Sequence, residues 1–177
     1  MNFELQPILR NALLEIIPLQ EDDFEILYTV ASDPLIWEQH PNKERYQREV
    51  FKNFFRGAIE SGGAFLVYEK SSRKIVGSSR FYELDEENQS VCIGYTFIGR
   101  EFWGKGHNSA LKTSLLEHAF QYVNKVQFHI GAENFRSQKA IEKIGAKKVG
   151  ELEVAYYGEA LKWNYIYQID RAAWVEK

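Results

Sequence analysis

The amino-acid sequence predicts a mixed α/β (α+β) fold in which helices cover one mostly antiparallel sheet. Three strand-like segments between residues 64 and 98 are joined only by short polar turns, as in antiparallel sheets. After residue 98, helix-like and strand-like segments alternate. The chain has 177 residues, 45% of them hydrophobic, and no repeat or low-complexity linker divides it. We therefore expect one domain over residues 1–177 with a substantial core.

The first part of the chain is expected to hold one strand and two helices. The strand lies at 13–19. Residues 20–23, Gln-Glu-Asp-Asp, begin a helix, because acidic residues favour a helix N-terminus. Pro34 ends this helix, since the residue before a proline avoids the helical conformation. A second helix is expected from about 43 to 60, with a wide apolar stripe that stops at Ser61-Gly-Gly.

Three strands follow in quick succession, at 64–69, 74–82 and 91–98. Lys70-Ser-Ser-Arg is typical of a hairpin turn between the first two. The polar loop 83–90 leads into the third strand, which is rich in β-branched and aromatic residues. These residue types favour a pleated, half-buried surface.

The rest of the chain alternates between helices and strands. A helix is expected from about 108 to 123, with its leucines on one face. A strand at 125–130 and a helix at about 137–144 follow, and the glycine directly after that helix is typical of a C-terminal cap. Two last strands are expected near 147–155 and 161–169.

Charge and composition argue against several classes of protein. The chain carries 22 Lys and Arg against 25 Asp and Glu, and a net charge of −3 is not typical of a nucleic-acid-binding protein. No run approaches the ~18 apolar residues of a membrane-spanning helix, and the N-terminal residues do not resemble a secretory signal. One Cys and four scattered His argue against a structural metal site. We expect a cytoplasmic protein with no metal, no nucleic-acid partner and no membrane partner.

The segment Arg100-Glu-Phe-Trp-Gly-Lys-Gly-His-Asn-Ser places two glycines between a strand and a helix. Backbone N–H groups at such a helix N-terminus can bind an anion, and a glycine lets a phosphate approach the backbone closely. A Gly-x-Gly alone is equally typical of an ordinary strand-to-helix turn. The segment matches neither the P-loop, which ends in Gly-Lys-Ser/Thr, nor the dinucleotide fingerprint, which has a third glycine.

Motifs around this loop follow one another in a coherent order. They are Ile93-Gly-Tyr, Phe102-Trp-Gly-Lys-Gly, Leu115-Leu-Glu-His-Ala-Phe, Asn134-Phe-Arg-Ser-Gln-Lys-Ala-Ile and Ile144-Gly-Ala. This series resembles the RimJ/RimL-like branch of the GNAT superfamily of acetyl-CoA-dependent N-acetyltransferases, over nearly the whole chain. The resemblance implies the GNAT fold, a twisted and mostly antiparallel sheet whose fourth and fifth strands splay apart. It also implies acetyl-CoA as co-substrate.

The resemblance further implies where acetyl-CoA binds. Backbone groups of Phe97 and Ile98 are expected to hold the pantetheine arm and the thioester. The pyrophosphate is expected against the N–H groups of the glycine loop and the helix start, namely those of Trp103, Gly104, Lys105, Gly106, His107, Asn108 and Ser109. Asn134 is expected to bind the pantetheine, with Arg136 and Lys139 near enough to meet phosphate.

Some of these residues have a second interpretation. Asn108 and Ser109 stand where the family more often has Thr-Glu, and either is equally suited to cap its helix. Ser137 matches a serine that RimL-like members place three residues after the asparagine, so Ser137 and Asn134 are the candidate catalytic residues. Ser137 would protonate the leaving thiolate, or simply cap its own helix. The tyrosine acid of many GNAT enzymes is replaced here by Ile141.

No general base is evident in the sequence. The family often has Glu-Ile-Gly-Tyr on the fourth strand, where this chain has Cys92-Ile-Gly-Tyr, and Cys92 is expected to be a small core residue without a His partner. The remaining candidate bases, each equally a solvated surface group, are Glu38, His40, Glu83, Asp85, Glu86 and Glu133. The expected substrate-binding residues are Trp37, His40, Tyr46 and Glu83, together with Tyr156 and Tyr157. The aromatic ones are equally candidates for the core.

We expect an N-acetyltransferase in which an amine attacks the thioester of acetyl-CoA directly. The acceptor is a protein N-terminal α-amine or a small-molecule amine, and the protein is a monomer or a homodimer. An α-amine, with a pKa of about 7.7–8.0, is partly neutral at pH 7, so the lack of an evident base favours it over a lysine side chain. The alternative is a catalytically inactive GNAT-fold module that binds acyl-CoA as a sensor or scaffold.

Overall fold

The computed structural model describes residues 2–155 and 159–175 and contains an eight-stranded sheet with the strand order β1-β2-β3-β4-β5-β6-β8-β7. The strands are β1 (Leu9–Arg10), β2 (Leu14–Pro18), β3 (Ala64–Glu69), β4 (Ile75–Asp85), β5 (Ser90–Ile98), β6 (Lys125–Gly131), β7 (Lys147–Ala155) and β8 (Leu161–Asp170). The α-helices are α1 (Phe24–Ala31), α2 (Arg48–Glu60), α3 (His107–Ala119), α4 (Phe135–Lys143) and α5 (Arg171–Val175). All neighbouring strands are antiparallel except β5 and β6, which confirms the expected fold class.

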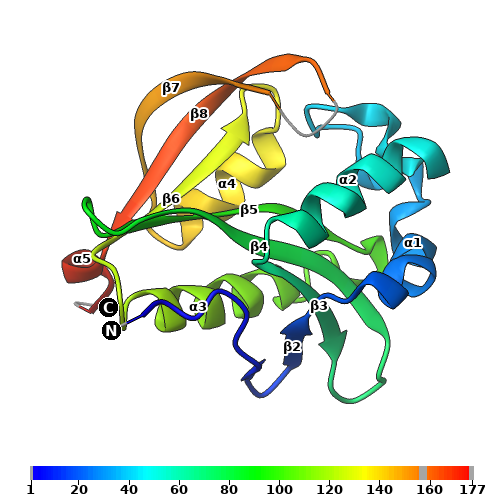
Figure 1. The fold of residues 1–177 in the computed structure, drawn as a ribbon, viewed down its shortest axis with the longest axis horizontal. Helices are drawn as coiled ribbons and strands as arrows, with labels where there is room; N and C mark the ends of the chain where they lie inside the picture. The colour runs from blue at the N-terminus through cyan, green and yellow to red at the C-terminus, as the bar shows by residue number, and fades with distance from the viewer. Residues whose placement is uncertain (1, 156–158, 176–177) are drawn as a thin grey trace.

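Helices cover both faces of the sheet, and each face has its own hydrophobic core (Figure 1). α1 and α2 lie on one face, where they pack with Leu66 and Phe97. α3 lies on the opposite face, where it packs with Phe65 and Val67. β3 serves both cores because successive side chains of a strand point to opposite faces.

The two parallel strands β5 and β6 are paired at one end only and diverge along the rest of their length. Hydrogen-bonded pairing joins only residues 90–92 to residues 125–127, and the two strands separate beyond them. On the other edge of β5, the register against β4 shifts between Ser78 and Arg80, a bulge in which Tyr95 has a φ of 52°. A bulge bends its strand and increases the local twist. The expected splay is therefore present, between β5 and β6 because the short β1 adds one strand to the count.

The bounds of three helices differ from those expected. Residues 43–60 form two pieces, a 3-10 helix at Lys43–Tyr46 and then α2, because Gln47 between them is extended with a ψ of 132°. α3 begins one residue early and ends at Ala119, four residues before the expected end. α4 begins at Phe135 rather than near residue 137, because the Asn134 side chain caps it. β1 and α5 were not expected at all.

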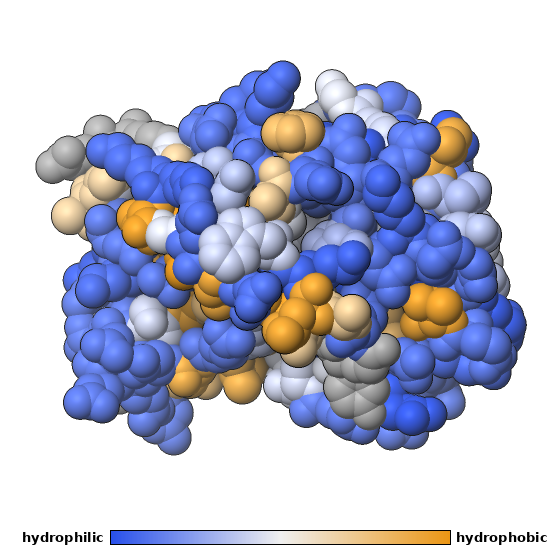
Figure 2. All heavy atoms as spheres, turned by 90° about the horizontal axis from the view of Figure 1, so that it is seen from above, coloured by the Kyte–Doolittle hydropathy of each residue, from blue (hydrophilic) through white to orange (hydrophobic). Residues whose placement is uncertain are grey.

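The outer surface is mixed in character. Figure 2 shows a largely hydrophilic face on which hydrophobic side chains lie in separate small groups. Phe135, 61% exposed, lies at the edge of the cleft described below. Within residues 2–155 and 159–175, no helix combines the length and apolar character needed to cross a bilayer.

Candidate active site

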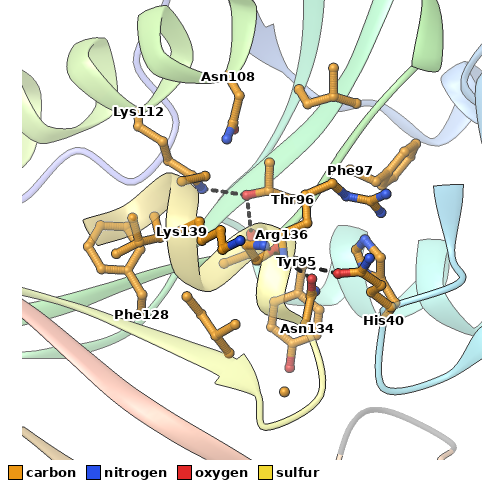
Figure 3. A pocket seen from close by; sticks show the side chains of 18 of the residues that line it. His40, Tyr95, Thr96, Phe97, Asn108, Lys112, Phe128, Asn134, Arg136 and Lys139 are labelled. Carbon is orange, nitrogen blue, oxygen red and sulfur yellow. Dashed lines mark hydrogen bonds between the residues drawn. The ribbon is translucent and has the colours of Figure 1, made fainter. Parts of the chain in front are cut away.

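A cleft of about 700 Å³ opens where β5 and β6 part, between α3 and α4 (Figure 3). Most of the expected site residues line it, namely His40, Phe97, Ile98, Trp103, Gly104, Gly106, Asn108, Ser109, Asn134, Arg136, Ser137 and Lys139. The other expected residues, Trp37, Tyr46, Glu83, Lys105 and His107, do not line it. The splay therefore brings the glycine loop and the start of α4 to one cavity, although they are far apart in sequence.

The glycine loop leaves backbone space open at the start of α3. Gly104 and Gly106 have φ values of 71° and 85°, and a Cβ atom built at either would find no other atom within 4 Å. A left-handed backbone favours glycine, and here nothing in the described part of the chain occupies the space beside it. The first N–H groups of a helix have no partner within the helix, so those at the start of α3 can bind an anion. Trp103 differs, because its N–H already donates to the Arg100 carbonyl at 3.1 Å.

Asn108 supplies an unpaired polar atom to the cleft. Gly106, not Asn108 or Ser109, is the N-cap of α3. The Asn108 Oδ1 atom is buried and has no hydrogen-bond partner among the described residues. A buried acceptor without a partner costs free energy, and an amide N–H of a pantetheine arm would satisfy it. The open backbone at Gly104 and Gly106 suits the pyrophosphate of a CoA thioester, and the Asn108 Oδ1 atom suits its pantetheine arm.

His107, the neighbour of Asn108, points away from the cleft. Its ring is 3% exposed, packs 4.8 Å from the Phe102 ring, and has its Nε2 atom 2.8 Å from Glu69 Oε1 of β3. Only the backbone of His107 is therefore available to the expected phosphate.

Asn134 and Ser137 divide the roles that the sequence left open. Asn134 is the N-cap of α4, and its Oδ1 accepts a 3.2 Å hydrogen bond from the Ser137 backbone N–H. The capping role that Ser137 could have filled is therefore taken by Asn134. The Ser137 hydroxyl lines the cleft and makes no hydrogen bond with another residue of the described chain. It is free to donate a proton to a group bound in the cleft.

Arg136 connects the walls of the cleft. Its guanidinium lies 4.0 Å from the centre of the Trp103 ring and donates a 3.0 Å hydrogen bond to the Ile36 carbonyl. Its backbone N–H donates to Gln39 Oε1 at 2.9 Å. Arg136 thus joins α4 to the glycine loop and to the segment after α1. It shapes the cleft as well as adding charge to it.

The charge of the cleft is opposite to that of the whole chain. Among the described residues that line it there is no Asp or Glu, and the cationic side chains are Arg45, Lys112, Arg136, Lys139 and Lys143. The chain as a whole has a net charge of −3. A cleft lined by one sign of charge concentrates ligands of the opposite sign. This cleft therefore suits an anionic ligand.

Lys112 of α3 is buried within the cleft (Figure 3). Its Nζ atom donates a 2.5 Å hydrogen bond to Thr96 Oγ1, which in turn lies 2.8 Å from Ser79 Oγ. No carboxylate of the described residues pairs with it. Burial lowers the pKa of Lys112 from 10.5 to about 7. The side chain thus ties α3 to the bulge of β5, and its ammonium form gives up its proton far more readily than that of an exposed lysine.

Replacing Lys112 by methionine is expected to flatten the pH dependence of stability between about pH 7 and pH 10. Across that range the unfolded chain, whose lysine keeps its ordinary pKa, holds more protons than the folded one, so the wild type gains stability as the pH rises. One pKa unit corresponds to about 1.36 kcal/mol, and the difference in bound protons acts over about two pH units between pH 7 and pH 9.5, so the gain should reach about 3 kcal/mol. Chemical denaturation at about pH 7 and pH 9.5 measures the gain, and an equal gain in both proteins would contradict the lowered pKa of Lys112.

The aromatic residues expected to bind substrate belong mostly to the core. Trp37 is 0% exposed and its Nε1 donates to the Ala31 carbonyl at 2.7 Å, while Tyr46 packs against the core under α1 and α2. His40 lines the cleft beside Trp37, and burial together with Arg45 and Arg136 lowers the pKa of His40 to about 3. A His with so low a pKa is neutral at pH 7 and a weak base. Tyr156 and Tyr157 lie outside the described residues.

His129 of β6 lines the cleft, although no motif in the sequence pointed to it. Its Nε2 atom lies 3.8 Å from Cys92 Sγ, and its Nδ1 atom lies 4.0 Å from Glu83 Oε2. Cys92 therefore has a His neighbour, contrary to expectation. Only the register of β5 against β6 could have revealed it, because the two residues are 37 apart in sequence.

Comparisons with known proteins agree with this architecture. The sequence model of the acetyltransferase (GNAT) domain matches residues 14–147. An uncharacterised N-acetyltransferase p20 of Bacillus licheniformis is 30% identical over 90 residues, which are 50% of this chain and 50% of that protein. The chain thus matches this curated relative over about half of its length.

Two solved structures illustrate the structural likeness. A GCN5-related N-acetyltransferase from Brucella melitensis superposes with a TM-score of 0.83 at 17% identity, over 98% of this chain and 83% of that chain. Mycobacterium smegmatis RimJ, solved in complex with CoA-disulfide, superposes with a TM-score of 0.69 at 16% identity, over 89% of this chain and 81% of that chain. At these identities the likeness concerns the fold.

A sheet that splays at one parallel pair, with a glycine loop opening the next helix, is the GNAT fold. The family match extends over most of the residues between β2 and β7. The chain therefore belongs to the GNAT acetyltransferase family.

Proposed function

We propose that this chain is an acetyl-CoA-dependent N-acetyltransferase that transfers the acetyl group directly to a primary amine, and that residues 1–177 act as one domain. The observation that carries the proposal is the cleft, which begins at the open glycine backbone, has only cationic charges on its described lining, and ends where β5 and β6 part. The CoA-disulfide bound to RimJ supports a CoA ligand for this fold. We further place the chain in the RimJ/RimL-like branch, as its motifs suggest, and in the cytoplasm as a monomer or homodimer.

Each part of acetyl-CoA then has a proposed partner. The amides of residues 104–109 hold the pyrophosphate, where the positive end of the α3 dipole adds to the attraction. Backbone groups of Phe97 and Ile98 and the Asn108 and Asn134 side chains hold the pantetheine arm. The thioester contributes an activated acetyl group, and the Ser137 hydroxyl donates a proton to the sulfur as it leaves.

The acceptor is proposed to be an amine of low pKa, such as a protein N-terminal α-amine or a weakly basic small amine. The described lining of the cleft holds no carboxylate that would attract an ammonium ion or a polycation. An α-amine with a pKa of about 7.7–8.0 is partly neutral at pH 7, so it meets less repulsion there than a lysine ε-amine.

A turnover assay with acetyl-CoA and a panel of amines tests this function. We expect free thiol to appear only when a primary amine is present, and the rate to rise as the pH approaches the pKa of that amine. Calorimetry on the same protein measures acetyl-CoA binding. Binding without turnover across α-amines, polyamines and lysine peptides would refute the enzyme and favour the inactive acyl-CoA-binding module.

Asn134 and Ser137 are expected to affect different parameters. Ser137→Ala should lower kcat about 10²-fold with little change in KM, because it removes the proposed acid. It should leave thermal stability nearly unchanged, since Asn134 is the cap. Asn134→Ala should raise the KM for acetyl-CoA and also lower the free energy of unfolding by about 1 kcal/mol, as a lost N-cap does. Steady-state kinetics with thermal melts measures both variants, and an unchanged kcat in Ser137→Ala would contradict the acid role.

A further inference from the structure

Three side chains, each from a different strand, converge beside the cleft, and His129 is the one of them that lines it. Glu83 comes from β4, Cys92 from β5 and His129 from β6. Their ligand-capable atoms all lie within 4.8 Å of one another, with Cys92 Sγ 3.7 Å from Glu83 Oε2 and 3.8 Å from His129 Nε2. This group of residues, called the β4–β6 cluster below, sits where the last paired residues of β5 and β6 give way to the splay.

The cluster lies on the face of the sheet opposite α3. Val91 and Ile93, the neighbours of Cys92, belong to the core under α3, and so do Phe128 and Ile130, the neighbours of His129. Side chains alternate along a strand, so Cys92 and His129 point to the other face. The glycine loop and α3, where the pyrophosphate is proposed, lie on the α3 side. An amine that reaches the thioester from the side opposite α3 would therefore pass this cluster.

The surroundings of His129 favour its neutral form through burial. Burial lowers the pKa of His129, and the nearby Glu83 carboxylate only partly opposes this. Tyr82 of β4 contributes an edge-on ring at 5.8 Å, and β8 places the uncharged Ile166 opposite His129. The imidazole is therefore neutral at pH 7 and can accept a proton.

Cys92 and Glu83 differ in what they can do. Burial, followed by the Glu83 charge, raises the pKa of Cys92 to about 12, so the group is a thiol and a poor nucleophile at pH 7. The Glu83 side chain is 64% exposed, whereas that of His129 is 6% exposed. Glu83 also has a left-handed φ of 49°, an uncommon backbone state for a residue with a side chain. It links the buried imidazole to solvent.

We propose that His129 is the proton acceptor for the ammonium form of the acceptor amine, with Glu83 as the positioning residue that passes the proton to solvent. With Nδ1 facing Glu83, the Nε2 lone pair takes the proton from the amine nitrogen. The freed lone pair on that nitrogen attacks the thioester carbonyl carbon, and the C–S bond breaks. The thiolate takes the proton of the Ser137 hydroxyl, and the second proton lost by the nitrogen as it becomes an amide restores that hydroxyl. The inference rests on the proposed function and gives it the base that the sequence lacked.

The test compares His129→Gln with Gln127→Leu, a change at the same face of β6 two residues earlier. His129→Gln should lower kcat/KM at pH 7 by about 10²-fold or more, a typical contribution of a general base. The difference in kcat/KM between this variant and the wild type should shrink above the pKa of the acceptor amine, because a neutral amine needs no base. The Kd for acetyl-CoA should stay the same, and Gln127→Leu should keep nearly full activity. Glu83→Gln should give a smaller loss and a shifted acidic limb of the pH profile.

Several results would overturn this assignment. If the wild type acetylates an amine and His129→Gln has the same rate and pH profile, His129 is not the base, while the proposed function stands. A wild type that binds acetyl-CoA and acetylates no amine would refute both. Loss of activity on chelation, restored by Zn²⁺ alone, would assign the cluster to a metal. An acetylated Cys92 detected by mass spectrometry would make the thiol a nucleophile and remove the need for His129.

Discussion

Replacing Gly106 by valine is expected to raise the Kd for acetyl-CoA about 10²–10³-fold. The backbone of Gly106 has a φ of 85°, and a left-handed conformation costs a bulky residue about 1–3 kcal/mol. The branched side chain would also enter the open space beside the first N–H groups of α3, where the pyrophosphate is proposed. Both effects oppose the bound state, the first by shifting the loop and the second by blocking the phosphate. Calorimetry with acetyl-CoA on the folded variant measures the change.

Gly62 provides a matched control for backbone strain. It has a φ of 63°, and a Cβ atom added there would also find no other atom within 4 Å, but it lies in the turn after α2 and away from the cleft. Gly62→Val should therefore cost a similar amount of stability and leave acetyl-CoA binding unchanged. Gly106→Asn should fall in between, because Asn tolerates the left-handed conformation but still fills the space. Normal binding by Gly106→Val would mean that the pyrophosphate lies elsewhere.

The features that the sequence predicted well are those set by local patterns. Strand runs joined by short turns are recognisable without a structure, and so is the alternation after residue 98. The glycine loop and Asn134 also carried their own signals, because a left-handed turn needs glycine and a helix start favours Asn. The choice of cap did not follow from residue type. Ser137 and Asn134 suit the position equally by type, and only the backbone shows that Asn134 holds it.

The features that could not be predicted depend on register and on burial. Cys92 and His129 meet because the parallel pairing sets Cys92 level with Gln127, two residues before His129 on the same face of β6, and no local pattern encodes that offset. Lys112 is 4% exposed because the β5 bulge turns Thr96 towards it, although a lysine on a helix is usually solvated. Trp37 was expected to bind substrate, but it is buried in the core. An aromatic residue near a cleft can be a substrate wall or core, and here its indole N–H is already satisfied within the core.

Replacing Arg45 by methionine is expected to lower the free energy of unfolding by about 3–5 kcal/mol, the usual cost of breaking a buried ion pair from one side. Arg45 donates two hydrogen bonds of 2.8 Å to the two carboxylate oxygens of Glu159, and the side chains are 2% and 7% exposed. Its guanidinium also lies 4.8 Å from the centre of the Phe54 ring. The pair fastens the segment just before β8 to the segment before α2, over one side of the cleft. Urea denaturation measures the loss.

The charge left behind, rather than the lost attraction, dominates this cost. Glu159 would remain buried without its partner, so the double variant Arg45→Met/Glu159→Gln should recover most of the stability. Arg48 is the matched control, because its pair with Glu25 is 44% and 70% exposed and such pairs contribute only about 0–1 kcal/mol. Arg48→Met should therefore unfold close to the wild-type midpoint. A single Arg45→Met variant as stable as Arg48→Met would show that the Glu159 carboxylate is hydrated, and that this wall of the cleft is open to water.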